Sequence, residues 1–365
     1  MIPDFNSRSR VMLFAPHPDD ESLACSVILQ RAVRARAAVR VIYVTNGEDN
    51  PWPHRVLERK WRLNSSDRNR WGKMRRAEAL AALAVLGVGP TETRFLGLPD
   101  QQLTSLLTSD YEPLLKRFAG EINDFGPTHL LVPSLSDTHP DHSALGVMLR
   151  LVGNAFFLHQ TAMRTWSYVV HGQSSAFFGR ATALTQSKIE TAKKRAAIAC
   201  HQSQIKLSRR RFFAYATRPE YLYRACAADF GVVEGSIHSA SRQRHSLQIT
   251  VRMQLKFIYR TEPALFVLGN GARGEFRCAK IDIPPRSKSV AARDVRTRRA
   301  IALAQYRGDS YAGELLVPTT TFAPHAPVFV KLERRSWFFD EAGWIEIPPV
   351  TAHGLTSALR LAGVA

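Results

Sequence analysis

The stretch VMLFAPHPDDESLACSVILQRAVRARAAVRVIYVTNGE, residues 11–48, decides the interpretation of the fold. Its first five residues are apolar and predict a short buried strand, and residues 21–37 carry apolar side chains at helical spacing. Residues 38–48 are rich in β-branched side chains and end in Asn-Gly, which predicts a second strand closed by a turn. A strand, a helix and a strand within about forty residues predict a βαβ unit.

The same alternation continues through residue 204. Further helices are predicted over 75–89, 111–127, 143–159 and 187–204, and further strands over 93–98, 128–134 and 165–171. Alternating strands and helices are typical of an α/β fold, a mostly parallel sheet with helices on both faces. In such sheets ligands bind at the carboxyl ends of the strands.

The pattern changes at about residue 231. From there the chain shows short alternating segments with Gly and Pro between them, such as SLQITVRMQLKFIYRT (246–261). These segments predict antiparallel strands. We therefore expect two domains, an α/β domain over residues 1–230 and a β-sandwich-like C-terminal domain of unknown role over residues 231–365.

Composition sets limits on the class of protein. The formal net charge of +19 over 365 residues indicates either an anionic partner or an arginine-rich surface. No apolar run is long enough to span a membrane, and the first ten residues lack the apolar region of a signal peptide. The four cysteines form no CxxC pair, so a reducing cytoplasm is the expected location.

Two polar loops follow predicted strands and hold the residues of a metal site. The first loop offers His17 and Asp20, and the second offers His139 and His142. A catalytic zinc takes three protein ligands from histidine and carboxylate and keeps a fourth position for water. Two ligands from the first loop and one from the second would complete such a site. The same donors also accept iron or cobalt, so zinc is not the only candidate.

The remaining side chains of these loops suit hydrolysis of an amide. Asp19 is placed to accept a proton from water, and a second histidine, His139, is suited to stabilising an oxyanion. Asp141 is a candidate for fixing the ring of that histidine from behind. Together these residues form a candidate metal-assisted hydrolase site.

The motifs APHPDDES and HPDH closely resemble those of the LmbE-like, or PIG-L, family of zinc-dependent N-deacetylases. The resemblance covers roughly residues 11–204 and implies a Rossmann-like sheet and removal of acetyl groups from N-acetylglucosamine units. It implies that the zinc ligands are His17, Asp20 and His142. It also implies that Asp19 is the general base and His139 the partner of the oxyanion.

The resemblance extends to shorter segments. RRAE (75–78) and FLGLPD (95–100) resemble family segments, which makes Arg75 and Asp100 candidate sugar-binding residues. HQSQ (201–204) resembles a late motif of the same domain. Pro16 stands where the family more often has alanine, a change that removes no ligand.

Residues 51–76 combine three tryptophans with many arginines and lysines. Such a segment can contact a glycolipid substrate, lie on an anionic membrane, or form a solvated loop. Binding to nucleic acid is a further alternative, although no specific nucleic acid is expected.

The sequence thus predicts a cytoplasmic zinc-dependent N-deacetylase that acts on an N-acetylated amino sugar within a larger glycoconjugate or glycolipid. An anionic conjugate and peripheral contact with an anionic membrane are the partners that the net charge suggests. One alternative is a metal hydrolase with the same site that cleaves a non-sugar amide or an ester. The other is a basic nucleic-acid-binding protein without catalytic activity.

Overall fold

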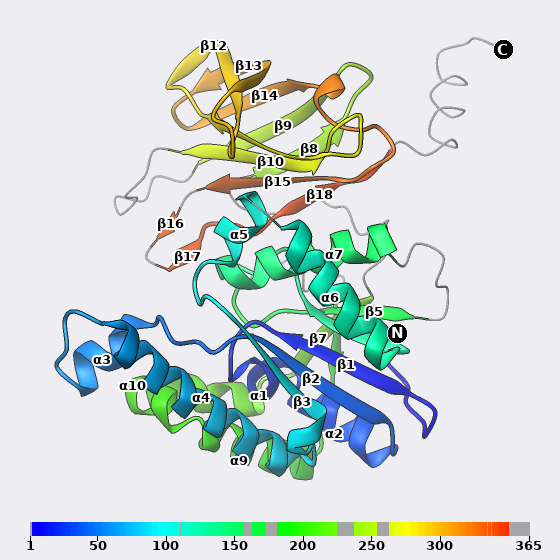
Figure 1. Cartoon of the computed structure of the whole chain (residues 1–365), viewed down its shortest axis with the longest axis vertical. Helices are drawn as coiled ribbons and strands as arrows, with labels where there is room; N and C mark the ends of the chain where they lie inside the picture. Colours follow the sequence, from blue (N-terminus) through cyan, green and yellow to red (C-terminus); the bar gives the residue numbers. More distant parts are fainter. Residues whose placement is uncertain are drawn as a thin grey trace. The chain divides into compact units, whose positions relative to one another are not determined.

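A computed structural model describes residues 2–349, except residues 110, 157–162, 173–180, 225–236, 254–262, 334 and 337. The described residues divide into two compact units. One contains most of residues 2–224 and the other most of residues 237–349. Each unit contains its own sheet (Figure 1).

The N-terminal unit is built on a seven-stranded sheet in the order β3-β2-β1-β4-β5-β7-β6. The first five strands in this order run parallel, and β7 and β6 are antiparallel additions at one edge. The prediction of a mostly parallel sheet is therefore confirmed. The strands are β1 (Arg10–Ala15), β2 (Ala38–Thr45), β3 (Thr93–Leu98), β4 (His129–Pro133), β5 (Arg164–Tyr168), β6 (Thr182–Leu184) and β7 (Glu220–Arg224).

Helices cover both faces of this sheet (Figure 1). Successive side chains of a strand point to opposite faces. In β1, Leu13 joins a core shared with α2, α4 and α9, whereas the ring of Phe14 packs edge-on against Phe118 of α6 at 5.6 Å between centroids. The helices are α1 (Asp20–Ala24), α2 (Ser26–Arg34), α3 (Pro51–Leu57), α4 (Ser65–Leu86), α5 (Leu103–Ser109), α6 (Glu112–Phe125), α7 (Pro140–Phe156), α9 (Lys188–Cys200) and α10 (Gln202–Thr217), with a 3-10 turn at Pro90–Glu92.

Several helix boundaries differ from the predicted ones. The helix predicted to start at residue 75 begins at Ser65, because Asn64 and Asp67 form a reciprocal capping box at its N-terminus. The helix predicted from residue 143 begins at Pro140, so the HPDH motif lies on its first turn, and the last three residues predicted for it lie outside the described residues. The segment predicted as one helix over 21–37 is divided at Cys25 into two.

The C-terminal unit carries a nine-stranded sheet in the order β18-β15-β10-β11-β12-β13-β14-β9-β8. Every pairing that is described in it is antiparallel, which confirms the predicted change of pattern. Its strands are β8 (Ile237–Arg242), β9 (Ser246–Arg252), β10 (Ala264–Asn270), β11 (Phe276–Asp282), β12 (Arg286–Asp294), β13 (Ala300–Asp309), β14 (Ala312–Pro318), β15 (Val328–Glu333) and β18 (Ile345–Ile347). A small hairpin of β16 (Arg335–Ser336) and β17 (Phe339–Asp340) and a 3-10 turn at Thr319–Thr321 complete the unit.

Two features of the described residues bear on the sequence analysis. None of their helices combines the length and apolar content needed to cross a bilayer. Cys25, Cys200 and Cys278 are free thiols, and Cys226 lies outside the described residues.

Candidate metal and catalytic site

Polar loops follow four neighbouring strands at the carboxyl edge of the seven-stranded sheet. His17 follows β1 and His142 follows β4, and these two strands pair in parallel. Gly47 follows β2 and Asp100 follows β3 on the other side of β1. The strand order reverses between β1 and β4, which is where open α/β sheets bind their ligands.

The backbone of the first loop is strained at Asp19. Its φ of 139° and ψ of −22° are rarely adopted by residues other than glycine. Neighbouring carboxylates hold the turn: the His17 N–H donates to Asp20 Oδ2 at 2.8 Å, and the Asp19 N–H donates to Glu21 Oε2 at 3.0 Å. A strained backbone conformation persists where surrounding contacts hold it in place, and such residues are concentrated at functional sites.

Three side-chain atoms from the two loops converge. His17 Nδ1 lies 3.1 Å from His142 Nε2, and Asp20 Oδ2 lies 3.5 Å from the first nitrogen and 3.4 Å from the second. A tetrahedral ion with bonds of 2.0–2.1 Å holds its ligand atoms about 3.3 Å apart. The donor set and its spacing therefore fit a zinc-like divalent ion.

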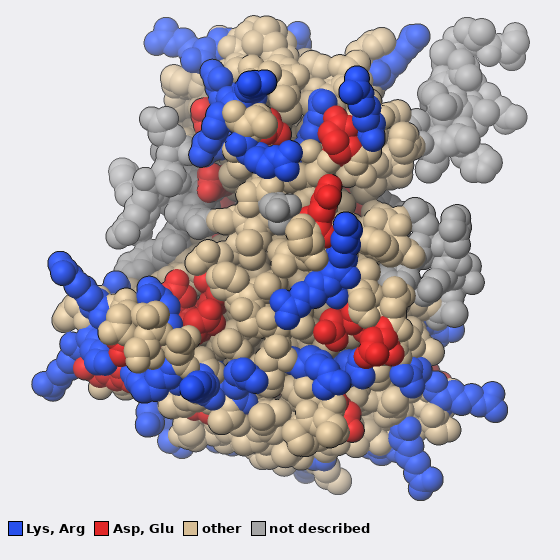
Figure 2. All heavy atoms as spheres, viewed as in Figure 1, with Lys and Arg blue, Asp and Glu red and all other residues tan. Residues whose placement is uncertain are grey.

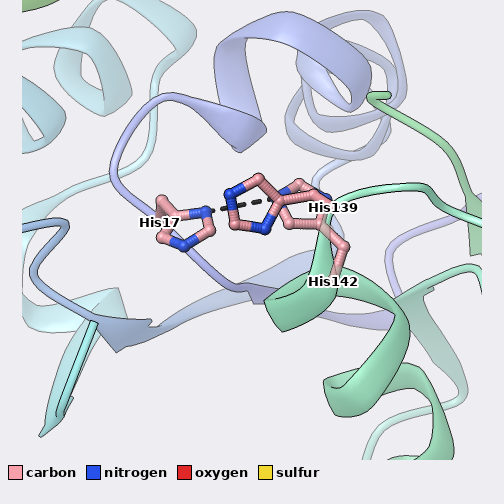
Figure 3. Close-up of side chains that lie close together, drawn as sticks. All are labelled: His17, His139 and His142. Carbon is pink, nitrogen blue, oxygen red and sulfur yellow. Dashed lines mark hydrogen bonds between the residues drawn. The ribbon is translucent and has the colours of Figure 1, made fainter. Parts of the chain in front are cut away.

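Further histidines border this cluster. Ligand atoms of His17, His139 and His142 lie within 4.8 Å of one another, and Figure 3 shows the three imidazoles together. His171, just beyond the end of β5, forms a second such group with Asp20 and His142. The structure thus brings the predicted oxyanion partner, His139, beside two of the predicted metal ligands.

Carboxylates contact the ring nitrogens of His17 and His142 that face away from the cluster. His17 Nε2 lies 3.2 Å from Asp100 Oδ1 and 3.4 Å from Asp141 Oδ2, while its Nδ1 faces the cluster. His142 Nδ1 lies 3.2 Å from Asp137 Oδ2, and that oxygen also accepts the Val170 N–H at 2.9 Å. A carboxylate on the second ring nitrogen fixes the tautomer and orientation of a metal-binding histidine.

Arg75 lies beneath Asp19 and is only 4% exposed. Its guanidinium donates to the carbonyl oxygens of Gly47 (2.9 Å) and Pro18 (2.5 Å) and to Asp19 Oδ2 (3.0 Å). Gly47 has φ +62°, and a Cβ on it would lie 1.8 Å from Arg75 Nη1. A glycine is needed there because it accepts the positive φ and lets the guanidinium approach.

Two of the shorter sequence segments lie side by side in the fold. Glu78 of RRAE accepts the Ser203 N–H at 2.7 Å and the Ser203 hydroxyl at 2.6 Å, which joins it to HQSQ. His201 of HQSQ is buried and its Nε2 lies 2.9 Å from Glu21 Oε1. These contacts join the first loop to His201, between α9 and α10, and join the start of α10 to α4.

The ionisable groups of the site have perturbed pKa values. Burial lowers the pKa of His17, but hydrogen bonds to Asp100 and other carboxylates outweigh it and the pKa is raised. Burial raises the pKa of Asp20, but the charges of His142, His17 and His171 and the hydrogen bond to His17 together outweigh it and the pKa is lowered. Burial raises the pKa of Asp19 to about 6, although Arg75 opposes the rise. Burial lowers the pKa of His171 to about 4.

The predicted sugar-binding residues are buried beside the cluster, and their sugar-binding role stays a prediction. Arg75 and Asp100 are each 4% exposed, and both are engaged by the loops around the site. Asp141 accepts the Gln101 N–H at 2.7 Å and contacts His17; its predicted role behind His139 stays a prediction.

Sequence reasoning missed two residues near the cluster. Asp137 lies in the same loop as HPDH, and a second carboxylate in that loop, beside Asp141, was the available signal. His171 had a weaker signal, a histidine that ends a predicted strand of the same sheet.

Residues 12–152 match a family model described as PIG-L: GlcNAc-PI de-N-acetylase. The 1D-myo-inositol 2-acetamido-2-deoxy-alpha-D-glucopyranoside deacetylase of Mycobacterium sp. (strain KMS) is 32% identical over 146 residues, which are 36% of this chain and 46% of that protein. The deacetylase of the same name from Mycolicibacterium vanbaalenii is 31% identical over 150 residues, 37% of this chain and 50% of the relative. The chain thus spans about half the length of these relatives.

Two solved structures are also similar. A deacetylase from the teicoplanin biosynthesis pathway is 16% identical with a TM-score of 0.46, and the match covers 60% of this chain and 99% of that one. The N,N'-diacetylchitobiose deacetylase from Pyrococcus horikoshii is 14% identical with a TM-score of 0.44, and the match covers 60% and 84% of the two chains.

Proposed function

Residues 12–152 form a PIG-L family region, and from that premise we propose that the chain is a metal-dependent hydrolase. In this proposal it removes the N-acetyl group from an N-acetylated amino sugar. The observation that carries the proposal is the spacing of three ligand atoms from two loops, between 3.1 and 3.5 Å.

We assign the metal ligands to His17, Asp20 and His142. A divalent ion supplies two functions in such a site, since it acidifies water and polarises a carbonyl oxygen. Zinc fits the histidine and carboxylate donors, and Fe²⁺ is the alternative to be tested.

The reaction needs proton transfer and stabilisation of negative charge. In the proposed mechanism Asp19 accepts a proton from the attacking water as its oxygen bonds to the acetamide carbon. The half-buried His139 donates a hydrogen bond to the carbonyl oxygen as negative charge develops there. The C–N bond then breaks as the nitrogen takes up a proton from Asp19 or His139, so that the amine leaves and acetate is the second product.

The buried polar residues around the cluster act by positioning these groups. Asp100 and Asp141 orient the ring of His17, and Asp137 orients that of His142. Arg75 holds the Asp19 carboxylate in place. A direct sugar contact stays a proposal for Arg75 and Asp100, although their burial leaves little surface for a ligand.

The substrate class rests on relatives and charge. The curated relatives are named as deacetylases of a 2-acetamido-2-deoxyglucose unit joined to inositol. The net charge of +19 favours a conjugate that carries negative charge. We therefore propose an N-acetylated amino sugar within a larger, anionic glycoconjugate or glycolipid.

We also propose an architecture and a location. Residues 1–230 would form the deacetylase domain on a Rossmann-like sheet, and residues 231–365 a β-sandwich-like domain of unknown role. A cytoplasmic location is supported by the free thiols of Cys25, Cys200 and Cys278.

A substrate screen tests the activity. The purified full chain is incubated with N-acetylglucosaminyl-inositol, free N-acetylglucosamine, a non-sugar acetamide and an acetate ester, with and without a chelator. We expect new primary amine and acetate from the sugar substrates, lost with the chelator and restored by zinc. If the chain hydrolyses only the ester or the non-sugar amide, the sugar assignment is rejected. That result would favour the alternative, a metal hydrolase with the same site that cleaves a non-sugar amide or an ester.

Metal analysis tests the site independently of the substrate. We expect near-stoichiometric zinc in the wild type and loss of it in His17→Ala and in His142→Ala. His325→Ala is the matched control because that histidine is exposed and belongs to the other unit. Equal metal content in all four proteins would overturn the ligand assignment.

A further inference from the structure

Residues 52–62 expose a concentration of apolar side chains. Trp52, Val56, Leu57 and Trp61 are 36%, 61%, 41% and 75% exposed. They are four of the nine large apolar side chains that are exposed among the described residues. Exposed apolar side chains that gather in one place, rather than singly, indicate a binding surface.

The same segment is strongly basic. Arg55, Arg59, Lys60 and Arg62 lie among the four apolar residues, with Glu58 as the one acid between residues 51 and 63. We call these eight basic and apolar residues the α3 patch. Figure 2, drawn in the view of Figure 1, shows Lys and Arg side chains around the place of α3.

The segment is anchored from beneath, so the α3 patch is presented by an ordered backbone. His54 is fully buried, its ring lies 4.7 Å from that of Trp71, and its carbonyl oxygen accepts the N–H groups of Glu58 and Lys60. Asn50 caps α3 by accepting the Trp52 N–H. Trp52 and Val56 are four residues apart on this helix and share one face.

We propose that the α3 patch binds the surface of an anionic lipid bilayer. Tryptophan partitions to the membrane interface, and basic residues near it are attracted to anionic headgroups. Single-stranded nucleic acid would contact the tryptophans by stacking and the basic residues through its phosphates. It would gain little from Val56 and Leu57, since these side chains cannot stack on bases. The aliphatic pair therefore favours the bilayer, where apolar side chains enter the acyl boundary.

The inference does not depend on the deacetylase activity, and vesicle binding tests it without a substrate. The full chain is mixed with vesicles of phosphatidylcholine alone and of phosphatidylcholine with phosphatidylglycerol, at low and high salt, and sedimented. We expect binding to the anionic vesicles that weakens as salt rises. Trp71, Trp166 and Trp344 are buried, and Trp337 lies outside the described residues. A blue shift of emission is therefore assigned to the α3 patch when the patch variants lose it.

Paired variants separate the α3 patch from the general charge of the chain. We expect Arg59→Glu with Arg62→Glu to weaken binding about tenfold or more, and Val56→Ser with Trp61→Ser to abolish the blue shift. The matched controls lie in the C-terminal unit: Arg296→Glu with Arg299→Glu, all four arginines being exposed, and Leu303→Ser, which is 58% exposed.

Three results would overturn the proposal. One is equal loss of binding in the patch variants and in the controls. Another is equal binding to neutral and anionic vesicles at every salt concentration. The third is tight, salt-sensitive binding to a fluorescent single-stranded oligonucleotide by a protein that leaves the vesicles unbound.

Discussion

Replacing Gly47 by alanine perturbs the support of Asp19 without touching a proposed ligand. The new Cβ would lie 1.8 Å from Nη1 of Arg75 and 2.5 Å from its Cζ, so the guanidinium must move. A flexible side-chain end usually moves at small cost, but Arg75 is 4% exposed and donates three hydrogen bonds. Moving it breaks hydrogen bonds inside the protein.

The loss of folding stability in Gly47→Ala has two contributions, one from the backbone and one from the guanidinium of Arg75. A left-handed backbone costs an alanine about 1–2 kcal/mol. Each hydrogen bond to a charged group contributes about 1.5–3 kcal/mol, and we expect the bonds of Arg75 to Gly47 O and to Asp19 to be lost. The guanidinium term is therefore about 3 kcal/mol or more, in addition to the backbone term.

Gly126→Ala is a matched control for the backbone term. Gly126 has φ +61°, against +62° for Gly47, and a Cβ there meets nothing within 4 Å. The difference in free energy of unfolding between the two variants, measured by urea denaturation, should therefore isolate the displacement of Arg75. We expect Gly47→Ala to be less stable by about 3 kcal/mol and to lose most of its activity.

A double-mutant cycle completes this test. In an Arg75→Ala background the alanine at position 47 should cost no more than it does at position 126. If Gly47→Ala and Gly126→Ala are equally destabilised in the wild-type background, Arg75 moves freely and our account of its hydrogen bonds is wrong.

Three further predictions concern single side chains. Asp19→Asn should lower kcat by about 10²–10⁴-fold and leave the zinc content unchanged, measured by steady-state kinetics and metal analysis; loss of zinc would contradict its role as a base. Asp137→Asn should weaken zinc binding about 10–100-fold in a chelator competition, because it orients His142; unchanged affinity would contradict that role. Hydrogen bonds from Arg31, from the Ser187 N–H and from Arg34 together lower the pKa of Glu190 from 4.5 to about 2. The stabilisation that they give the folded state is present above pH 4.5 and is lost as the pH falls toward 2. Glu190→Gln should therefore lower the free energy of unfolding by about 2 kcal/mol at pH 7 and should lose less stability between pH 4.5 and 2 than the wild type. Urea denaturation across this pH range measures both, and an equal loss in the two proteins would refute the account.

Much of the N-terminal sheet could be predicted because each strand is a local pattern. The apolar run before His17 and the β-branched run of residues 38–45 need no distant contact to identify them. The start of α4 could not be found this way, because the Trp- and Arg-rich segment before it has no apolar periodicity. Its start depends on a capping box, Asn64 with Asp67, that differs from the common Ser or Thr with Glu.

The ligand set could also be proposed from sequence, since paired motifs after two strands place their side chains at one edge. The residues that contact the proposed ligands from behind could not be predicted from sequence. Asp100 faces His17 across 83 positions of chain, and only the register of β3 beside β2 and β1 brings them together. The sequence also could not predict that Asp100 and Arg75, the candidate sugar-binding residues, are buried, because burial is a property of the tertiary fold.

The crowding of three acids in the first loop has an explanation in this fold. Adjacent carboxylates repel one another, and burial adds a desolvation cost to each. The loop distributes that cost by directing each acid to a different cation or histidine from a different element. The pairs are Asp19 with Arg75, Asp20 with His142, and Glu21 with His201. Of the three partners, only that of Asp20, His142, is also a proposed metal ligand. The proposed base, Asp19, therefore has a partner that does not contact the metal. We therefore expect Asp19 to be neutralised without loss of the ion, whereas a change at Asp20 would remove a proposed ligand and the partner of His142 together.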